Sequence, residues 1–226
     1  MYDSTVNFTL DTICPWTYLA KKRLDEALRI VRETDASEKV NFTVAYHPYQ
    51  LYPEASQEGE DKFQWYKKSK YGDSAEKMMT YIKVMTAYGN TAGISYKFGG
   101  TVANTLPAHR VVQHFQETKG PIVADKLINS LYRQYFEEEK HPSSKETLMA
   151  ACKEAGIDEK DAQTIIDDEY EGLQETKSKI REQAGNGVDS VPFVLVEGKR
   201  RDMTLQGAQE VAGYVKALQQ VVKESN

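Results

Sequence analysis

The spacing of hydrophobic and polar positions changes period several times near the start of the chain. Residues 5–10 alternate and are rich in β-forming side chains, which predicts a strand. Residues 15–33 carry apolar side chains at helical spacing, and Pro15 suits the first turn of a helix. Residues 40–46 alternate again and predict a second strand. A strand, a helix-length crossover and another strand favour a parallel pair and an α/β fold.

The middle of the chain, about residues 60–183, shows helical spacing almost throughout. Within it, Ser143-Ser144-Lys145-Glu146 has the pattern of a capping box, which opens a helix. Gly156 suits the end of that helix, and Asp158 suits the N-cap of the next one. We therefore expect a large all-helical block after the second strand.

Alternation returns after Gly185–Gly187, which interrupts the helical pattern. Residues 192–196 predict a short buried strand, Arg201–Leu205 its hairpin partner, and Gly207–Val222 a last amphipathic helix. The order β-α-β, helical block, β-β-α is that of a thioredoxin fold split by a helical insertion. The expected segments are the first part of the thioredoxin-fold domain, the helical insertion and the second part, at residues 1–56, 57–184 and 185–226.

Cys14 lies where the first predicted strand gives way to the first predicted helix. A thiolate at a helix N-terminus faces unpaired backbone N–H groups and the positive end of the helix dipole. Both favour the charged form, so we expect the pKa of Cys14 to fall below that of a free cysteine and the thiolate to act as a nucleophile. The alternative is a buried cysteine that only ends a strand.

The composition and net charge limit the kinds of molecule that the protein is expected to bind. Apolar residues make up 40% of the chain and charged residues 28%, as in ordinary globular proteins. The net charge of −5 argues against a nucleic acid or an anionic membrane as partner, because both attract a basic surface. The acidic runs Glu137–Glu139 and Asp167–Glu169 lack metal-ligand spacing, so no metal is expected.

The two cysteines and the first residues of the chain indicate the cellular compartment. The first residues have neither a basic region nor an apolar core of the kind found in signal peptides, and no apolar run approaches the roughly 18 residues that span a bilayer. Cys14 and Cys152 are expected to be free thiols in a reducing, cytoplasmic setting. The sequence does not decide whether the two cysteines form a disulfide with each other.

The motif around Cys14 resembles a known active-site turn. Asp11-Thr12-Ile13-Cys14-Pro15-Trp16-Thr17-Tyr18 is similar to the D-x-x-C-P-W-C-Y turn of the DsbA-like thioredoxin-fold oxidoreductases, particularly their cytosolic branch associated with polyketide pathways. Other stretches resemble that branch in the same order: His47–Pro53 with Gly59, Asn104-Thr105-Leu106-Pro107-Ala108-His109-Arg110, Val188-Asp189-Ser190-Val191-Pro192-Phe193, and Gly207-Ala208-Gln209.

The resemblance implies a substrate-binding surface around the cysteine. It implies that Pro192 is cis and faces Cys14, and that Val191 pairs its main chain with a cysteine-containing substrate such as glutathione. It also assigns Pro15 and Trp16 to the substrate-contacting turn. From the residues alone, Pro192 is expected to be an ordinary trans proline that opens a strand.

Thr17 departs from the resemblance, because the family carries a second cysteine there. That thiol resolves the mixed disulfide formed by the first, and a threonine cannot do so. The Thr17 hydroxyl is expected to donate to the Cys14 thiolate and to help keep its pKa low. A monothiol site can still exchange with glutathione. Cys152 is a candidate partner, but its apolar helical neighbours favour a core position.

Related families without the second cysteine are the 2-hydroxychromene-2-carboxylate isomerases and the kappa-class glutathione transferases. They carry serine at the position of Cys14 and an acidic G-x-D-R pattern at the last helix. This chain has Gly207-Ala208-Gln209-Glu210 there, so the acid–base pair is not reproduced. A helix N-terminus at Gly207 is still expected to bind a carboxylate through backbone N–H groups.

Polar and aromatic residues elsewhere leave alternatives open. Arg110 suits a carboxylate clamp and His109 an acid or base, but both equally suit buried structural roles. Asn104 is either a substrate-side amide or a helix cap, and the cap is favoured. An aromatic cluster lines a substrate pocket or packs between layers: Tyr46, Tyr49, Tyr52, Trp65 and Tyr66.

The sequence therefore predicts an enzyme that performs thiol–disulfide exchange at Cys14 as a monothiol, linked to glutathione. A glutathione-dependent isomerase or transferase acting on an unsaturated or aromatic small molecule, as in secondary metabolism, is the main alternative. A non-catalytic binding protein on the same fold is the other. A small-molecule or thiol substrate is expected, and a homodimer is compatible with the chain.

Overall fold

The first strand–helix–strand unit forms as its pattern predicts. The computed structural model describes residues 1–225. Strand β1 (Tyr2–Leu10) leads to α1 (Pro15–Arg32), a short 3-10 turn η1 (Asp35–Glu38) and β2 (Val40–Pro48). The two strands are parallel, with Tyr2 opposite Val40 and Leu10 opposite Pro48. Both strands extend beyond the alternating segments that predicted them, since backbone pairing continues past the residues whose burial sets the pattern.

The last part of the chain completes the sheet. Strands β5 (Phe193–Val196) and β6 (Met203–Gln206) form an antiparallel hairpin, and the sheet has the order β2-β1-β5-β6. Helix α9 (Val211–Glu224) begins at Val211 rather than at Gly207, so the predicted start is wrong. Gly207 has a φ of +72°, a left-handed conformation that turns the chain out of β6 instead of starting a helix.

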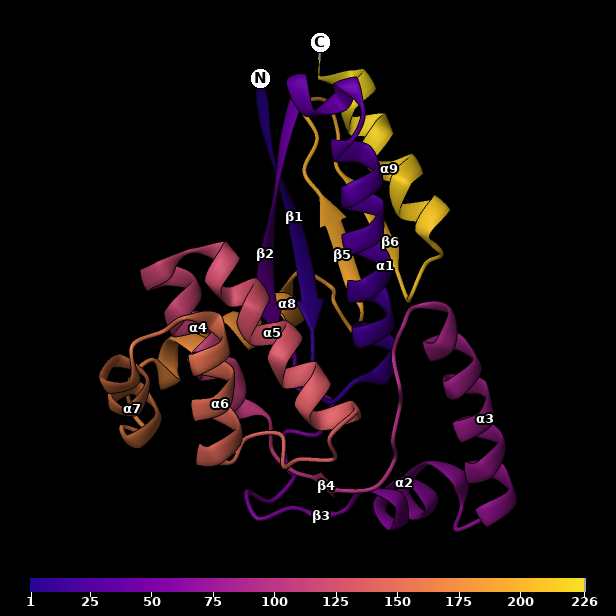
Figure 1. Cartoon of the computed structure of the whole chain (residues 1–226), viewed down its shortest axis with the longest axis vertical. Coiled ribbons are helices and arrows are strands. Elements are labelled where there is room, and N and C mark those ends of the chain that lie inside the picture. The colour runs from indigo at the N-terminus through magenta and orange to yellow at the C-terminus, as the bar shows by residue number, and fades with distance from the viewer. Residues whose placement is uncertain (226) are drawn as a thin grey trace.

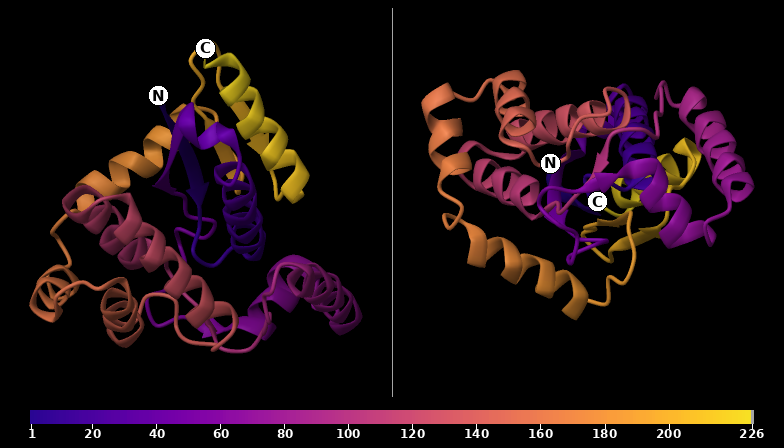
Figure 2. Two further views of the ribbon diagram at one scale, coloured as in Figure 1. Left: turned by 45° about the horizontal axis from the view of Figure 1, so that its top comes forward. Right: turned by 90° about the horizontal axis from the view of Figure 1, so that it is seen from below.

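The sheet has one apolar and one more polar face. Val6, Phe8 and Leu10 of β1 are buried, while the alternate residue Thr9 donates to Gln183 on α8 (Leu173–Gly185). Helices α1 and α9 lie side by side against the apolar face of the sheet, opposite to α8 (Figures 1 and 2). This thioredoxin arrangement, an α/β sheet covered by helices, confirms the predicted fold class.

Four helices of the insertion pack against one another, and the first two of them also contact β2 (Figure 1). They are α4 (Leu106–Lys119), α5 (Pro121–Phe136), α6 (Lys145–Ala155) and α7 (Glu159–Asp167). The cap of α6 is Ser144, which accepts from the N–H of Thr147, so the capping box predicted from Ser143 and Glu146 is wrong by one position. The predictions at the next turn are confirmed, since Gly156 ends α6 with a φ of +79° and Asp158 caps α7.

A helical hairpin and a small ladder interrupt the predicted helical block. Helices α2 (Lys62–Tyr71) and α3 (Ala75–Thr91) project from the body near the start of α1 (Figure 1). The two-residue strands β3 (Glu60–Asp61) and β4 (Thr101–Val102) pair between them and α4. Gly59 allows this close approach, because a Cβ there would lie 2.3 Å from a Thr101 methyl carbon. A nearly continuous helical pattern did not reveal these strands, since they are too short to alternate.

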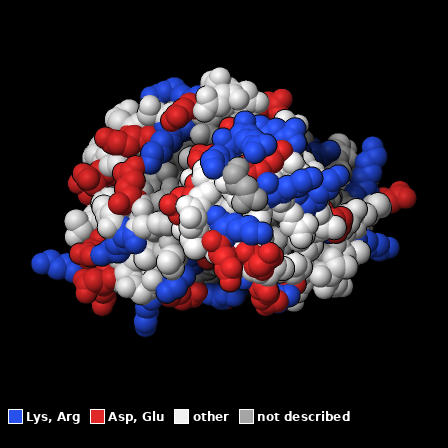
Figure 3. All heavy atoms as spheres, turned by 90° about the horizontal axis from the view of Figure 1, so that it is seen from above, with Lys and Arg blue, Asp and Glu red and all other residues white. Residues whose placement is uncertain are grey.

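Charged side chains of both signs are interspersed over the face that carries the chain ends (Figure 3). No helix within residues 1–225 is long and apolar enough to cross a membrane. In the same residues, no three His, Cys, Asp or Glu side chains gather as a set of metal ligands. Cys14 and Cys152 are both free and buried. Cys152 lies on α6 and packs in the hydrophobic core of the protein.

Candidate active site at Cys14

The main chain between β1 and α1 places Cys14 at the N-cap of α1. The N–H of Cys14 donates to the carbonyl of Asp11 at 3.1 Å, which closes the turn that leaves the strand. The carbonyl of Cys14 accepts from the N–H groups of Thr17 and Tyr18 at 3.1 and 3.2 Å, the first bonds of the helix. Pro15 takes the first helical position, where a missing N–H costs nothing. The sequence alone therefore sets this local geometry.

The Cys14 thiol faces the loop before β5. Its Sγ donates to the carbonyl oxygen of Val191 at 3.9 Å, and the Val191–Pro192 peptide bond is cis. Tyr49 fixes the loop from the other side, because its hydroxyl donates to the carbonyl of Asp189 at 2.8 Å. The N–H of Val191 has no partner among residues 1–225, so it is available to a ligand at the sulfur.

Burial reverses the predicted effect on the pKa of Cys14. The side chain is 4% exposed, and desolvation raises the pKa of the thiol to about 11. The N–H groups of Thr17 and Trp16 lower this pKa, and the negative charge of Asp11 raises it. The prediction of a thiol more acidic than free cysteine is wrong, because removal of the sulfur from water outweighs the helix N-terminus.

Thr17 takes part in a buried network beneath the sulfur. Its hydroxyl lies 2.8 Å from the carbonyl oxygens of Asp11 and Cys14, and it accepts from the hydroxyl of Tyr132 at 2.8 Å. The Thr17 side chain also lowers the pKa of Cys14, as expected, but this effect is smaller than that of burial. Thr17 thus ties the active-site turn to α5.

Asp11 and His109 form a fully buried pair behind the turn. The His109 Nε2 atom lies 3.3 Å from Asp11 Oδ1, and the N–H of Leu51 donates to Asp11 Oδ2 at 2.7 Å. His109 is 1% exposed and Asp11 is not exposed at all. Asp11 belongs to the motif but received no role from the sequence. Its position joins the turn, the segment after β2 and helix α4.

Arg110 and Asn104 hold loops together. Arg110 donates to the carbonyls of Ile165, Asp168 and Glu171 at 2.6–2.9 Å, so its guanidinium is engaged by main chain at the end of α7. The predicted carboxylate clamp is therefore not formed by that nitrogen. The N-cap of α4 is Thr105, so the favoured prediction that Asn104 is the cap is wrong by one position; Asn104 Oδ1 instead accepts from the N–H of Leu106, the first residue of the helix, at 2.9 Å.

The amide nitrogen of Asn104 holds the segment between β2 and β3. It donates to the carbonyls of Pro53 and Ala55 at 2.8 and 3.1 Å, while its oxygen also accepts from Gln50. All four hydrogen-bonding positions of this amide are thus directed at protein. Asn104 acts on the site by fixing the residues that precede Tyr52 and follow it.

Gly207, Ala208 and Gln209 lie in the loop before α9. Arg23 of α1 donates to the carbonyls of Ala208 and Gln209 at 3.5 and 3.3 Å and pairs with Glu210 at 2.8 Å. Because α9 begins at Val211 and the N–H of Gly207 donates to the carbonyl of Pro192 at 2.9 Å, these residues do not form the predicted helix N-terminus.

Trp16 and Pro15 contact the projecting hairpin and the segment after it. The rings of Trp16 and Tyr88 lie edge to face at 5.5 Å, and the hydroxyl of Tyr96 donates to the carbonyl of Pro15 at 2.5 Å. The start of α1 is therefore enclosed by α3 and the residues that follow it.

The aromatic residues grouped by the sequence separate in space. Tyr52, Trp65 and Tyr66 form a continuous set, with ring centroids 4.3 and 5.3 Å apart. Tyr46 lies elsewhere, where its hydroxyl donates to Asp125, and Tyr49 contacts the cis-proline loop. Proximity in sequence was the only signal, and it does not distinguish the two faces of β2.

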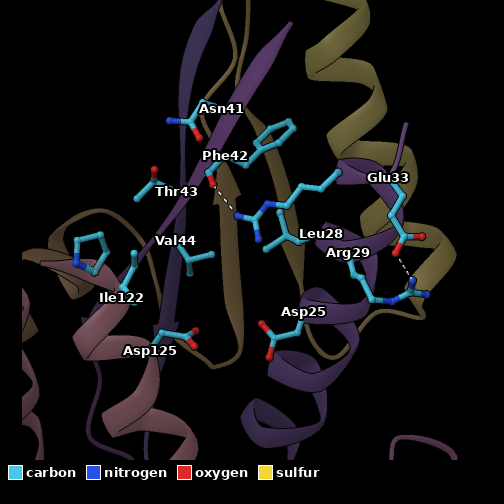
Figure 4. Close-up of a pocket in the computed structure, with 12 residues that line it drawn as sticks. Asp25, Leu28, Arg29, Glu33, Asn41, Phe42, Thr43, Val44, Ile122 and Asp125 are labelled. Carbon is cyan, nitrogen blue, oxygen red and sulfur yellow. Dashed lines mark hydrogen bonds and ion pairs between the residues drawn. The ribbon is translucent and has the colours of Figure 1, made fainter. Parts of the chain in front are cut away.

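A surface hollow of about 760 Å³ lies between α1, β2 and α5 (Figure 4). Asp25 and Asp125 approach each other across it, and Lys21, which is fully buried, pairs with them at 2.5 and 3.0 Å. Arg32, which also lines the hollow, donates to the carbonyl of Phe42 at 2.8 Å. Neither cysteine lines this hollow, so we take its charges as a packing cluster.

Sequence reasoning missed two residues near the site. Tyr135 of α5 is 1% exposed, and its hydroxyl has no hydrogen-bond partner within the described part of the chain. Lys62 opens α2, is also 1% exposed, and lies with its Nζ 3.9 Å from the centroid of the Tyr135 ring. A lysine in a polar helix is normally a surface residue, so no local pattern signals this burial.

Comparisons with known proteins agree with the geometry. A family model described as "DSBA-like thioredoxin domain" matches residues 5–219. No curated protein matches the chain by sequence. A probable DsbA oxidoreductase from Streptomyces coelicolor has a similar structure, with a TM-score of 0.83 and 24% identity over 98% of this chain and 91% of that one.

Two further structures are similar. A 2-hydroxychromene-2-carboxylate isomerase has a TM-score of 0.68 and 15% identity, covering 97% of this chain and 96% of that one. The cytosolic disulfide reductase DsbM from Pseudomonas aeruginosa, solved with GSH, has a TM-score of 0.59 and 13% identity, covering 97% and 96%. At these identities the likeness is one of fold.

Proposed function

The chain belongs to the DSBA-like thioredoxin domain family, and from this premise we propose that it is a thiol–disulfide exchange enzyme with one reactive thiol, Cys14. Glutathione is the second thiol of the proposed cycle. The observation that carries the proposal is the position of Cys14 Sγ at a helix N-cap, 3.9 Å from the carbonyl oxygen before the cis-proline.

The main chain of Val191 supports substrate binding in this proposal. Its N–H, unpaired within residues 1–225, and its carbonyl lie beside the sulfur, where an extended cysteine-containing segment can pair with both. The Thr17 hydroxyl contacts carbonyl oxygens and Tyr132 beneath the sulfur. Because Thr17 supplies no thiol, an external thiol must complete each cycle.

The cycle balances without a cofactor held by the protein. The Cys14 thiolate attacks the glutathione sulfur of a mixed disulfide between glutathione and another thiol, a Cys14–glutathione disulfide forms, and the other thiolate leaves with the bonding electrons. The proton of the Cys14 thiol goes to solvent. A glutathione thiolate then attacks the Cys14–glutathione disulfide, restores the Cys14 thiolate and releases oxidised glutathione. Each cycle thus frees one thiol from its mixed disulfide and converts one further glutathione to oxidised glutathione.

A glutathione-dependent isomerase or transferase is the second candidate. The aromatic set at Tyr52, Trp65 and Tyr66, close to a thiol without a resolving partner, favours it. The structural likeness to an isomerase supports it at the level of fold. In that case bound glutathione is the nucleophile and Cys14 makes no lasting adduct. The cytosolic reductase among the similar structures supports a cytoplasmic location for either activity.

Mass spectrometry after incubation with oxidised glutathione tests the proposal. We expect one glutathione on Cys14, its removal by reduced glutathione, and no adduct on a Cys14→Ser variant, in which only Cys152 remains. Incubation at pH 9 increases the thiolate of a thiol whose pKa is about 11. If no adduct forms even there, the exchange function is wrong, and turnover of an unsaturated substrate with glutathione would then support the second candidate.

A further inference from the structure

The segment directly after β2 is hydrogen-bonded to both sides of the site. The hydroxyl of Tyr49 donates to the carbonyl of Asp189, in the loop before the cis-proline, at 2.8 Å. Two residues later, the N–H of Leu51 donates to Asp11 Oδ2 in the active-site turn at 2.7 Å. The N–H of Tyr49 itself donates to the carbonyl of Leu10 at 2.9 Å, which continues the pairing of β2 with β1. Tyr49 is thus fixed to the turn that carries the cysteine, while its side chain reaches the loop on the other side.

Gln50 fixes the same segment to the helical insertion. Its side-chain amide donates to Asn104 Oδ1 at 2.9 Å, and the Asn104 amide nitrogen donates in turn to the carbonyls of Pro53 and Ala55. The main chain around Tyr49 is therefore held on both sides of this residue. A hydroxyl can fix a loop only from a base of this kind, because on a mobile segment it would move together with the loop.

The loop that receives the hydrogen bond from Tyr49 has few other attachments. Between Val188 and Pro192, the structure of residues 1–225 shows two hydrogen bonds to loop main chain from other segments, one from the Tyr49 hydroxyl and one from the Cys14 thiol. The bond from the thiol is long, at 3.9 Å, and a thiol is a weak donor. Asp189 is exposed, so packing adds little. The hydroxyl makes the stronger of the two bonds.

The hydrogen bond from Cys14 to the loop is lost during the proposed reaction. A thiolate has no proton to donate, and neither sulfur of a Cys14–substrate disulfide carries one. The loop has to keep its place at this moment, because the N–H and carbonyl of Val191 then pair with the substrate. The Tyr49 hydroxyl keeps its proton, since burial raises its pKa above the ordinary value of 10.0. The bond from Tyr49 to Asp189 then remains to hold the loop beside the turn.

We propose that Tyr49 is a positioning residue for substrate binding, whose hydroxyl holds the Val191 main chain at the distance from Cys14 at which a disulfide flanked by peptide groups pairs with it. The inference deepens the exchange function proposed above and rests on it. A disulfide without amide groups gains nothing from an ordered main chain at Val191. Because Tyr49 acts through the loop, its effect falls on the binding of peptide-like disulfides and not on the attack by sulfur.

Two uncharged disulfides separate binding from reactivity. The disulfide of N-acetylcysteine amide has amide groups on both sides of each cysteine, whereas hydroxyethyl disulfide has none. In each reaction the Cys14 thiolate attacks one sulfur, a mixed disulfide with Cys14 forms, the other thiolate leaves with the bonding electrons, and the thiol proton goes to solvent. The second-order rate constants are measured in a Cys152→Ala background at pH 9, which increases the thiolate of a thiol whose pKa is about 11.

The quantity compared between variants is the ratio of the two rate constants, amide probe over hydroxyethyl probe, so that the intrinsic reactivity of Cys14 cancels. We expect Tyr49→Phe to lower this ratio about fivefold, the size of one hydrogen bond, and to change the hydroxyethyl rate constant by less than about twofold. Tyr170→Phe is the matched control, because Tyr170 is 83% exposed and precedes α8. It is expected to keep the ratio within about twofold. Urea denaturation checks that both variants are folded.

A ratio that Tyr49→Phe does not lower overturns the inference. Rate constants that fall together for both probes also overturn it, because the hydroxyl would then support the fold of the turn and not the pairing of the substrate. Failure of the exchange function gives a different result, since no glutathione adduct forms on the parent protein while the probe ratio still responds to Tyr49→Phe. No reaction of Cys14 with either probe contradicts both proposals.

Discussion

Two opposite effects act on the sulfur of Cys14. The helix N-terminus and the N–H groups of Thr17 and Trp16 favour the thiolate, and burial at 4% exposure disfavours it. Burial is the stronger effect, because desolvation of a whole charge exceeds what partial charges at a helix end return. With a pKa of about 11, roughly one molecule in ten thousand carries the thiolate at pH 7.

The pH dependence of Cys14 alkylation follows from this pKa. We expect the rate with iodoacetamide to rise about tenfold per pH unit from pH 7 to about pH 10, because the thiolate fraction does so below a pKa of about 11. The measurement is the loss of free thiol at each pH. Cys14→Ser reports the background of Cys152, whose pKa burial raises to about 12. A rate that levels off near pH 8.5 would contradict the burial argument.

Thr17→Cys is expected to create dithiol chemistry. The new sulfur stands at the position of the missing resolving thiol, so it can attack a mixed disulfide on Cys14. We expect catalysed insulin reduction with dithiothreitol, at least about tenfold above the parent protein, and a disulfide between Cys14 and the introduced cysteine in the oxidised form. The double variant with Cys14→Ser is the control and is expected to be inactive.

A stability cost accompanies Thr17→Cys, since the hydroxyl of Tyr132 then loses a good acceptor. The cost is about 1–2 kcal/mol in the free energy of unfolding. An active-site disulfide that fails to form in a folded Thr17→Cys protein would show that burial, and not the missing thiol, limits the reaction.

At the scale of elements, polar side chains join the segments that carry the site. Asp11 connects the turn before α1 to Leu51 and to His109 on α4. Tyr49 connects the segment after β2 to the cis-proline loop. These contacts explain how the loops keep their relative positions although neither cysteine forms a disulfide, since Asp11 and Tyr49 each hydrogen-bond to another segment. The helical insertion thus holds the turn at Cys14 in position through the contact between His109 and Asp11.

Arg110→Ala tests the connection between α4 and the end of α7. The substitution leaves the carbonyls of Ile165, Asp168 and Glu171 without their donor. We expect a loss of about 2–4 kcal/mol in the free energy of unfolding, measured by urea denaturation. Arg29→Ala is the control, because Arg29 is a surface residue whose ion pairs contribute about 0–1 kcal/mol. Equal losses in the two variants would show that Arg110 is not structural.

At the scale of the whole molecule, the helical insertion determines the electrostatic surroundings of Cys14. Helices α3 and α5 cover the start of α1, where Trp16 contacts Tyr88 and Tyr18 stacks on Tyr132, and Cys14 is buried at that end of α1. The same packing encloses Lys62, and burial lowers its pKa to about 8. Aromatic rings therefore surround both a neutral thiol and an amine that loses its proton more easily than usual.

Lys62 makes stability depend on pH in a definite direction. Its folded pKa of about 8 lies below the ordinary 10.5, so the unfolded state binds more protons between these values. The free energy of unfolding therefore rises with pH in that window, by about 1 kcal/mol from pH 8 to pH 9. Cys14 acts oppositely only above its ordinary value of 9.0, because its folded pKa is raised.

Urea denaturation of the parent protein and of Lys62→Met at these pH values isolates the effect. The difference in unfolding free energy between the two proteins is expected to change by the stated amount, because all other titrating groups are shared. A difference that stays constant from pH 8 to pH 9 would mean that Lys62 keeps its proton in the folded state.

The sequence by itself determined the order of the four strands of the main sheet and of the helices α1 and α9, the position of Cys14 at a helix N-cap, and the caps at Gly156 and Asp158. These features depend on neighbouring residues, which local patterns record. Only the tertiary structure decided the burial of Cys14 and Lys62, the partners of Arg110 and the separation of Tyr46 from Tyr52. Desolvation and hydrogen bonding of a buried group depend on segments far away in sequence, so no local pattern contains them.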